Sequence, residues 1–187
     1  MRIHANNEEL MEKYDNLFKQ QEQSGIIEQV DKKSAYNSQN PIHYLPHHPV
    51  FAETKNTKIR SVFDGSAKSS KKFNSLNDCI YKGKTLLNDL TAMLIRFRKE
   101  EIGLVADIEK AFHQINLCPQ DRDVVRFLWL ADIKKPLTEE NLRIFRFQRV
   151  PFGIIASPFL LLATIQFHFE KQNSELELFF FFNTYYA

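Results

Sequence analysis

The sequence predicts an α+β fold, and three observations support this prediction. Residues 8–23 and 157–171 carry apolar side chains at the spacing of a helix with one buried face. Residues 124–130 and 142–148 are apolar runs separated by a charged connection, as in an antiparallel hairpin. A chain of 187 residues with 43% hydrophobic content suits one domain, or an incomplete piece of a larger one.

The first predicted element is an amphipathic helix at residues 8–23. Its apolar positions recur at helical spacing with charges between them: Leu10, Tyr14, Leu17 and Phe18. Gly25 ends this helix, and residues 26–30 suit a short strand. Residues 31–40 are polar and predict a loop, while the three prolines of residues 41–50 favour an extended chain.

The next predicted elements are a strand, a loop and a helix. Residues 57–64 contain three apolar residues and predict a strand, and residues 65–74 predict a loop rich in Ser and Lys. A helix over residues 86–97 follows from apolar residues at helical spacing: Leu86, Leu87, Leu90, Met93, Leu94 and Phe97.

The second half begins with an apolar run at residues 102–106, which predicts a strand that ends on Asp107. Residues 108–117 then favour a helix that stops before a proline. The Ser-Pro pair that opens residues 157–171 is typical of a helix start. Residues 172–187 include four consecutive phenylalanines, which match neither helical nor strand periodicity, so we expect this segment to be atypical and weakly ordered.

The bulk composition narrows the possible functions. The net charge of +2 is too small to indicate a nucleic-acid partner by itself. Basic residues nevertheless cluster at three places: Lys68, Lys71 and Lys72; Arg96, Arg98 and Lys99; Arg143, Arg146 and Arg149. The two cysteines form no C-x-x-C pair, so neither a zinc site nor a disulfide framework is expected. No secretory signal or membrane span is recognisable, so we expect an intracellular, cytoplasmic protein without a membrane partner.

The segment around Asp107 is the most informative part of the chain. A carboxylate at a strand end lies at a sheet edge, where a metal ion and a phosphate can reach it. A lone aspartate of this kind is more often a surface acid, so the rest of the segment matters. Residues 106–115 read ADIEKAFHQI, and downstream residues 149–153 read RVPFG, followed by SPFLL at residues 157–161.

Together these strings resemble motifs A and B of a reverse transcriptase palm, and their wording resembles the Bel/Pao class of long-terminal-repeat retrotransposons. Residues 57–64, TKIRSVFD, resemble a fingers strand of the same family. The resemblance implies the fingers and partial palm of a right-hand polymerase, incomplete here. It divides the chain into an N-terminal helix and linker (1–40), the fingers and partial palm (41–171) and the atypical tail (172–187).

The resemblance also implies roles for particular residues. Asp107 corresponds to a catalytic carboxylate that binds Mg²⁺, with the backbone carbonyl of Ile108 as a further metal ligand. Phe112 corresponds to the steric gate that crowds a ribose 2′-hydroxyl and so favours deoxynucleotides. Without the resemblance, packing in the core is the ordinary interpretation of this aromatic residue.

Three more residues correspond to nucleotide-binding positions. Arg60 would hold the incoming triphosphate, to which a guanidinium can bind through two parallel hydrogen bonds. Phe152 would face the nucleotide, and Gly153 would allow the backbone to lie close to the template base. One of the three arginines Arg143, Arg146 and Arg149 could face template phosphates, and the sequence does not indicate which.

The family's paired aspartates of motif C have no counterpart, because no aspartate follows Asp132. We therefore expect a truncated, catalytically inactive fragment of an RNA-directed DNA polymerase, whose family partners are an RNA or DNA primer-template and deoxynucleotides. Two alternatives stay open: a non-catalytic nucleic-acid-binding remnant that uses Arg60 and the basic loop, or an enzyme whose aspartates come from another chain or a longer product. The oligomeric state is left open.

Overall fold

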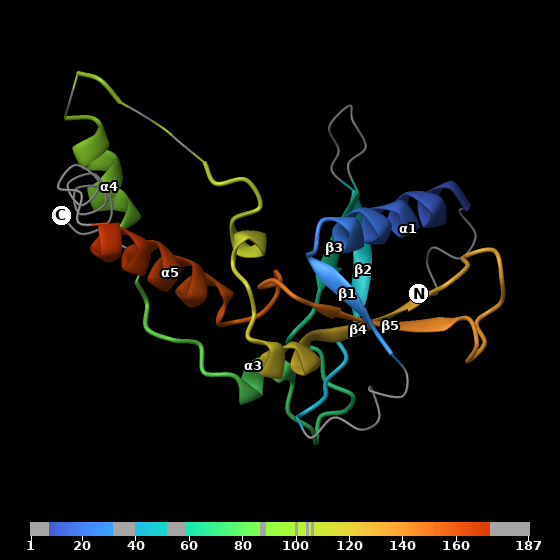
Figure 1. Ribbon diagram of the computed structural model, residues 1–187. Helices are drawn as coiled ribbons and strands as arrows, with labels where there is room; N and C mark the ends of the chain where they lie inside the picture. The colour runs from blue at the N-terminus through green and yellow to red at the C-terminus, as the bar shows by residue number, and fades with distance from the viewer. Residues whose placement is uncertain are drawn as a thin grey trace.

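The computed structural model describes residues 8–31, 40–51, 59–86, 89–99, 101–103, 105 and 107–172 (Figure 1). These residues form a mixed structure with two small antiparallel sheets, as the predicted α+β class requires. The elements in chain order are α1 (Glu8–Gln23), β1 (Ile27–Val30), β2 (His47–Phe51), β3 (Ile59–Phe63), α3 (Leu76–Cys79), α4 (Leu90–Phe97), η1 (Ala111–Gln114), η2 (Pro119–Val125), β4 (Arg126–Leu130), β5 (Leu142–Phe147) and α5 (Ser157–Gln172). The atypical segment expected after residue 171 lies outside the described residues apart from Gln172.

The larger sheet has three antiparallel strands in the order β1, β5, β4. β4 and β5 are the predicted hairpin, with Phe127 opposite Phe145. β1 pairs with the other edge of β5, with Ile27 opposite Phe147. Because successive side chains of a strand face opposite sides, these apolar residues gather on one face of the sheet.

The smaller sheet is the hairpin of β2 and β3, in which Val50 lies opposite Arg60. The extended segment before β2 joins the two sheets. In that segment the Leu45 N–H donates to the Arg126 carbonyl at 2.7 Å, and the Arg126 N–H donates to the His43 carbonyl at 3.2 Å. The prolines of this region therefore lie in extended chain, as the sequence predicts.

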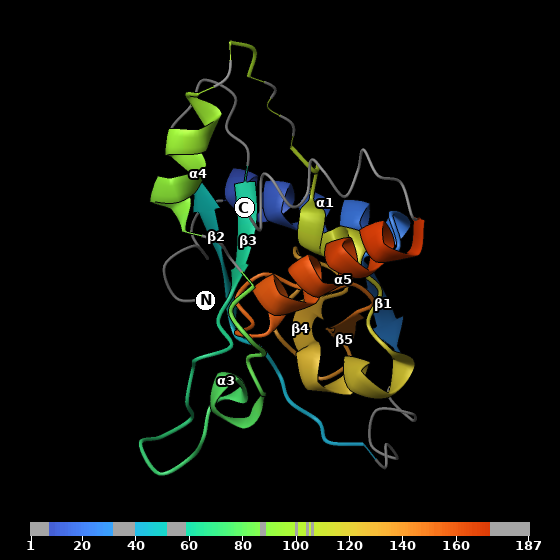
Figure 2. The ribbon, with the colours of Figure 1, turned by 90° about the vertical axis from the view of Figure 1, so that its left-hand side faces the viewer.

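Helix α1 packs against both sheets and completes the core (Figures 1 and 2). Its Tyr14 and Phe18 rings are buried and lie 5.1 and 4.9 Å from the Trp129 ring. His47 lies in the same aromatic cluster. Its Nε2 must donate to the Leu128 carbonyl, at 3.0 Å, so its Nδ1 accepts from the Tyr14 hydroxyl at 2.7 Å in the neutral ring.

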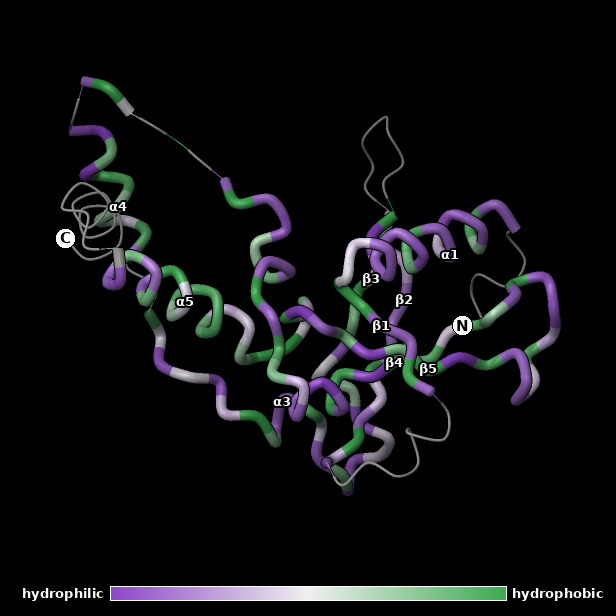
Figure 3. The backbone as a smooth tube through the Cα atoms, in the orientation of Figure 1, coloured by the Kyte–Doolittle hydropathy of each residue, from purple (hydrophilic) through white to green (hydrophobic). Residues whose placement is uncertain are grey.

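Helix α4 lies to one side of the sheets, as Figures 1 and 2 both show. Asp89 caps it by accepting from the Thr91 N–H at 2.9 Å. None of its side chains is buried, and Leu94, Ile95 and Phe97 are exposed. Figure 3 shows hydrophobic residues within both α4 and α5.

Two predicted elements around Asp107 are not formed. No strand is present at the described residues of 102–106, and Ile102 and Val105 are 80% and 87% exposed. An apolar run becomes a strand only beside a partner strand, and the described residues of this segment pair with neither sheet. The predicted helix at 108–117 is reduced to the short 3₁₀ turn η1, because Lys110 before it has a left-handed φ of 51° that an α-helix cannot continue.

Candidate functional site

The turn at residues 151–153 is the centre of the candidate site. Pro151 is fully buried, whereas the Phe152 side chain is 50% exposed. Gly153 has a φ of +89°, and a Cβ atom at this position would lie 2.1 Å from the Phe63 carbonyl oxygen. A glycine permits this close backbone approach, while the approach to a template base that the resemblance implies for Gly153 stays a prediction. The neighbour that it approaches is the end of strand β3.

The structure brings two predicted site residues into contact although they are far apart in the sequence. The rings of Phe112 and Phe152 meet edge to face, with their centroids 4.7 Å apart. His113 lies beside this pair, 5.5 Å from Phe152, and stacks on Phe147 at 6.4 Å. Burial lowers the pKa of His113, and the charges of Lys110 and Arg149 act in the same direction. A neutral, apolar aromatic surface is the result.

Asn77 fastens the turn to the segment after β3, and sequence reasoning assigned it no role. Its Nδ2 donates to the Gly153 carbonyl at 3.1 Å and to the Ser66 hydroxyl at 2.9 Å. Its Oδ1 accepts from the Ile155 N–H at 2.9 Å. The only sequence signal is local: Ser75 and Asp78 have the spacing of a helix start, which places Asn77 in a short helix.

That short helix, α3, holds Asn77 in place. Ser75 and Asp78 form a capping box, because each side chain accepts from the other residue's backbone N–H. Lys68 also pairs with Asp78 at 2.6 Å. The hydrogen bond from Lys68 and those from Ser75 lower the pKa of the Asp78 carboxyl to about 2. Asp78 is therefore ionised at neutral pH and remains an acceptor for the cap.

Arg60 lies on β3, the strand that leads to the turn. Its side chain is exposed, and it is three residues before Phe63, hence roughly 10 Å along the strand. An odd separation in a strand places Arg60 on the face opposite Phe63, which is buried in the core. The guanidinium therefore faces away from the core, on the strand that also contacts Gly153.

Asp107 and Ile108 do not have the setting that their predicted roles require. Both are exposed, Ile108 by 50%, and the described residues just before them form no strand. Within the described part of the chain, no group of three or more His, Cys, Asp or Glu side chains could hold a metal ion. A two-metal site needs several carboxylates, so these residues alone do not fit Mg²⁺.

The three arginines near the turn are engaged within the protein. Arg146 pairs with Glu28 at 2.7 Å and with Asp123 at 2.8 Å, and these hydrogen bonds raise its pKa against the effect of burial. Arg143 donates to nearby backbone carbonyls. The side chain of Arg149 makes long contacts of 3.4 Å to two carbonyls of the described residues, those of Gly25 and Gln114. Arg149 is thus the arginine that could turn most easily toward a phosphate.

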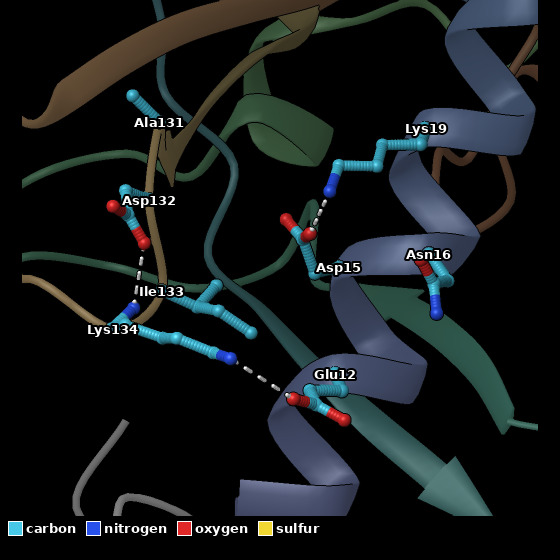
Figure 4. Close-up of a pocket in the computed structure, with 8 residues that line it drawn as sticks. All are labelled: Glu12, Asp15, Asn16, Lys19, Ala131, Asp132, Ile133 and Lys134. Atoms are coloured by element: carbon cyan, nitrogen blue, oxygen red, sulfur yellow. Dashed lines mark hydrogen bonds and ion pairs between the residues drawn. The ribbon is translucent and has the colours of Figure 1, made fainter.

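A cavity of about 470 Å³ lies elsewhere, between α1 and the connection after β4 (Figure 4). Its charged groups are all paired: Lys19 with Asp15 at 2.6 Å, Lys134 with Glu12 at 3.8 Å, and Asp132 with Lys135, which lies outside the lining, at 3.5 Å. It contains none of the predicted site residues. Its paired charges give no preference for an anion or a cation, so we place the candidate site at the 151–153 turn.

Comparison with models of known protein families and with curated protein sequences returns no match for this chain. Within its described residues, no helix has the length and apolar character needed to cross a membrane.

Proposed function

We propose that this chain is the fingers and part of the palm of an RNA-directed DNA polymerase of the Bel/Pao reverse transcriptase type. The contact between Phe112 and Phe152, at 4.7 Å, is the observation that carries the proposal. The motif resemblance gives both side chains a place beside the incoming nucleotide, so it requires them to be close in space. Nothing in their sequence separation alone requires that.

The proposal includes the family's substrates, a primer-template and deoxynucleotides, and an intracellular place of action. Phe112 would exclude a ribose 2′-hydroxyl, and Arg60 would bind the triphosphate through its guanidinium. Mg²⁺ is the family's cofactor and clamps the attacking and leaving oxygens in nucleotidyl transfer. We assign no step to it, because the described residues include no group of three or more His, Cys, Asp or Glu side chains that could hold a metal ion.

A primer-template binding experiment tests the proposal. We expect the chain to bind a fluorescently labelled DNA primer annealed to an RNA template more tightly than a blunt duplex of the same length. Arg60→Ala should weaken the additional binding produced by a matching deoxynucleotide, whereas Lys134→Ala, in the remote cavity, should leave it unchanged. Equal affinity for the two nucleic acids, with no effect of deoxynucleotide, would contradict the proposal.

A second candidate function is nucleic-acid binding without catalysis. Residues 66–84 contain five lysines and a single aspartate, and Phe73 and Tyr81 in this segment are 64% and 80% exposed. Exposed cations beside exposed aromatic rings suit a single strand, because phosphates bind the cations and bases stack on the rings. This candidate predicts equal affinity for a single strand and a primer-template, with binding that weakens steeply as salt rises.

A further inference from the structure

We propose that Asn77 is a positioning residue, which fixes the Phe112–Phe152 aromatic pair relative to strand β3. The hydrogen bonds of Asn77 are independent of the proposed function. The consequence for nucleotide binding rests on that function. Asn77 lies in α3, far along the chain from both aromatic residues. The spacing of Ser75 and Asp78 indicates a helix start, but no local pattern indicates the contact with the turn.

Asn77 contacts the turn at two backbone groups, which lie on either side of Ile154. Its Nδ2 donates to the Gly153 carbonyl at 3.1 Å, and its Oδ1 accepts from the Ile155 N–H at 2.9 Å. One amide side chain thereby satisfies two backbone groups in a turn that is not part of a sheet. Since Phe152 immediately precedes Gly153, these bonds restrict the backbone that aims the Phe152 ring at Phe112.

The same amide connects the turn to the segment after β3. Nδ2 also donates to the Ser66 hydroxyl at 2.9 Å, and the Asn77 N–H donates to the Gly65 carbonyl at 2.9 Å. Gly65 itself has no room for a side chain, because a Cβ would lie 2.7 Å from the Gly153 carbonyl oxygen. The strand that carries Arg60 and the turn that carries Phe152 therefore meet at Asn77.

An amide is the side chain that this position requires. A carboxylate could accept from the Ile155 N–H but would set a negative oxygen against the Gly153 carbonyl. An alanine would leave both backbone groups without their partner. Loss of such bonds costs about 1 kcal/mol each, which corresponds to a roughly fivefold change per bond in a local opening equilibrium.

Three variants of the full chain test this role by NMR. Asn77→Ala removes both contacts to the turn, and Asn77→Asp keeps the acceptor alone. Asn74→Ala is the matched control, because it removes the side chain of an exposed asparagine nearby. We expect Asn77→Ala to raise the hydrogen-exchange rate of the Ile155 amide roughly tenfold or more. It should also abolish the nuclear Overhauser contact between the Phe112 and Phe152 rings. Asn77→Asp should give an intermediate exchange rate, and the control should change neither signal.

Unchanged Ile155 exchange and an unchanged ring contact in a folded Asn77→Ala protein would overturn the inference. If that variant does not fold, Asn77→Asp decides: exchange and ring contact equal to those of the wild type would overturn it as well. Primer-template affinity, measured on the same samples, tests the proposed function separately. A wild-type chain that shows the ring contact but binds no primer-template would refute the proposed function and leave the role of Asn77 intact.

Discussion

Replacing Gly153 by alanine should be among the most destabilising small substitutions in this protein. Two separate costs add at this position. An alanine held at a φ of +89° is in a region that L-residues disfavour by about 1–2 kcal/mol. Its Cβ would also lie 2.1 Å from the Phe63 carbonyl oxygen, so the turn must move away from β3. Overpacking of this kind costs about 1–3 kcal/mol, and we expect a total loss of about 2–5 kcal/mol in the free energy of unfolding.

Gly25→Ala is the matched control, because it places an alanine at a positive φ without a close contact to its Cβ. Gly25 has a φ of +64°, but a Cβ there would lie 3.8 Å from its nearest neighbour, an ordinary contact. We expect a loss of about 1–2 kcal/mol for this variant. Urea unfolding followed by tryptophan fluorescence measures both losses, since Trp129 is buried in the core.

The difference between the two variants therefore isolates the close contact of the turn with β3. Equal losses for Gly153→Ala and Gly25→Ala would refute the close approach. They would also remove the basis for the position of Phe152, since the turn would not be held where we describe it.

Three further outcomes follow from the site and the core. In a chimera that restores motif C and the rest of the polymerase, Phe112→Val should admit ribonucleotides, and unchanged discrimination in a primer-extension assay would exclude Phe112 as the gate. Burial lowers the pKa of His47 in the folded protein from 6.5, so the unfolded chain binds the proton more readily. The contribution of His47 to stability should be complete above about pH 6.5 and should be lost as the pH falls toward the lowered pKa. Urea unfolding at several pH values measures this loss. The full chain alone should not extend a primed RNA template with deoxynucleotides and Mg²⁺, and template-dependent extension that Asp107→Ala abolishes would contradict this.

The sequence predicts those elements well whose pattern is local and strongly periodic. The helix α1 was expected at 8–23 and spans Glu8–Gln23, because Tyr14 and Phe18 recur at the helical spacing that buries them. The hairpin of β4 and β5 was also predicted, since two apolar runs flank a charged connection. In the helix and in the hairpin, the apolar residues whose spacing predicts the element are also the residues that become buried.

The segment near Asp107 shows where this reasoning stops. The apolar residues of 102–106 have strand character, but a strand needs a partner, and partners are a property of the whole fold. The left-handed φ of Lys110 is equally invisible in the sequence, because lysine has no preference for that conformation. The missing partner strand and the left-handed Lys110 together determine the position and exposure of Asp107. Neither can be predicted from the residues that flank Asp107.

The candidate site stays a prediction, and the structure bears on the positions of its residues alone. Motif resemblance placed Phe112, Phe152 and Gly153 in one site, and the structure shows the two rings in contact. Asn77 could not be found this way, because its partners Gly153 and Ile155 are distant in sequence and it bonds their backbones. Every residue type supplies the same backbone carbonyl, and almost every type the same N–H. No residue pattern therefore identifies Gly153 and Ile155 as the partners of Asn77.

Photo-crosslinking tests the central claim most directly, because it asks which residues touch the nucleotide. The full chain would be bound to a primer-template together with 4-thiothymidine triphosphate as the matching incoming nucleotide, then irradiated and digested. The crosslinked peptides would be identified by mass spectrometry. We expect crosslinks in the peptides that contain Phe112 or Phe152. The yield of these crosslinks should fall in Phe152→Ala. Crosslinks confined to other regions, such as the cavity around Lys19 and Lys134, would contradict it.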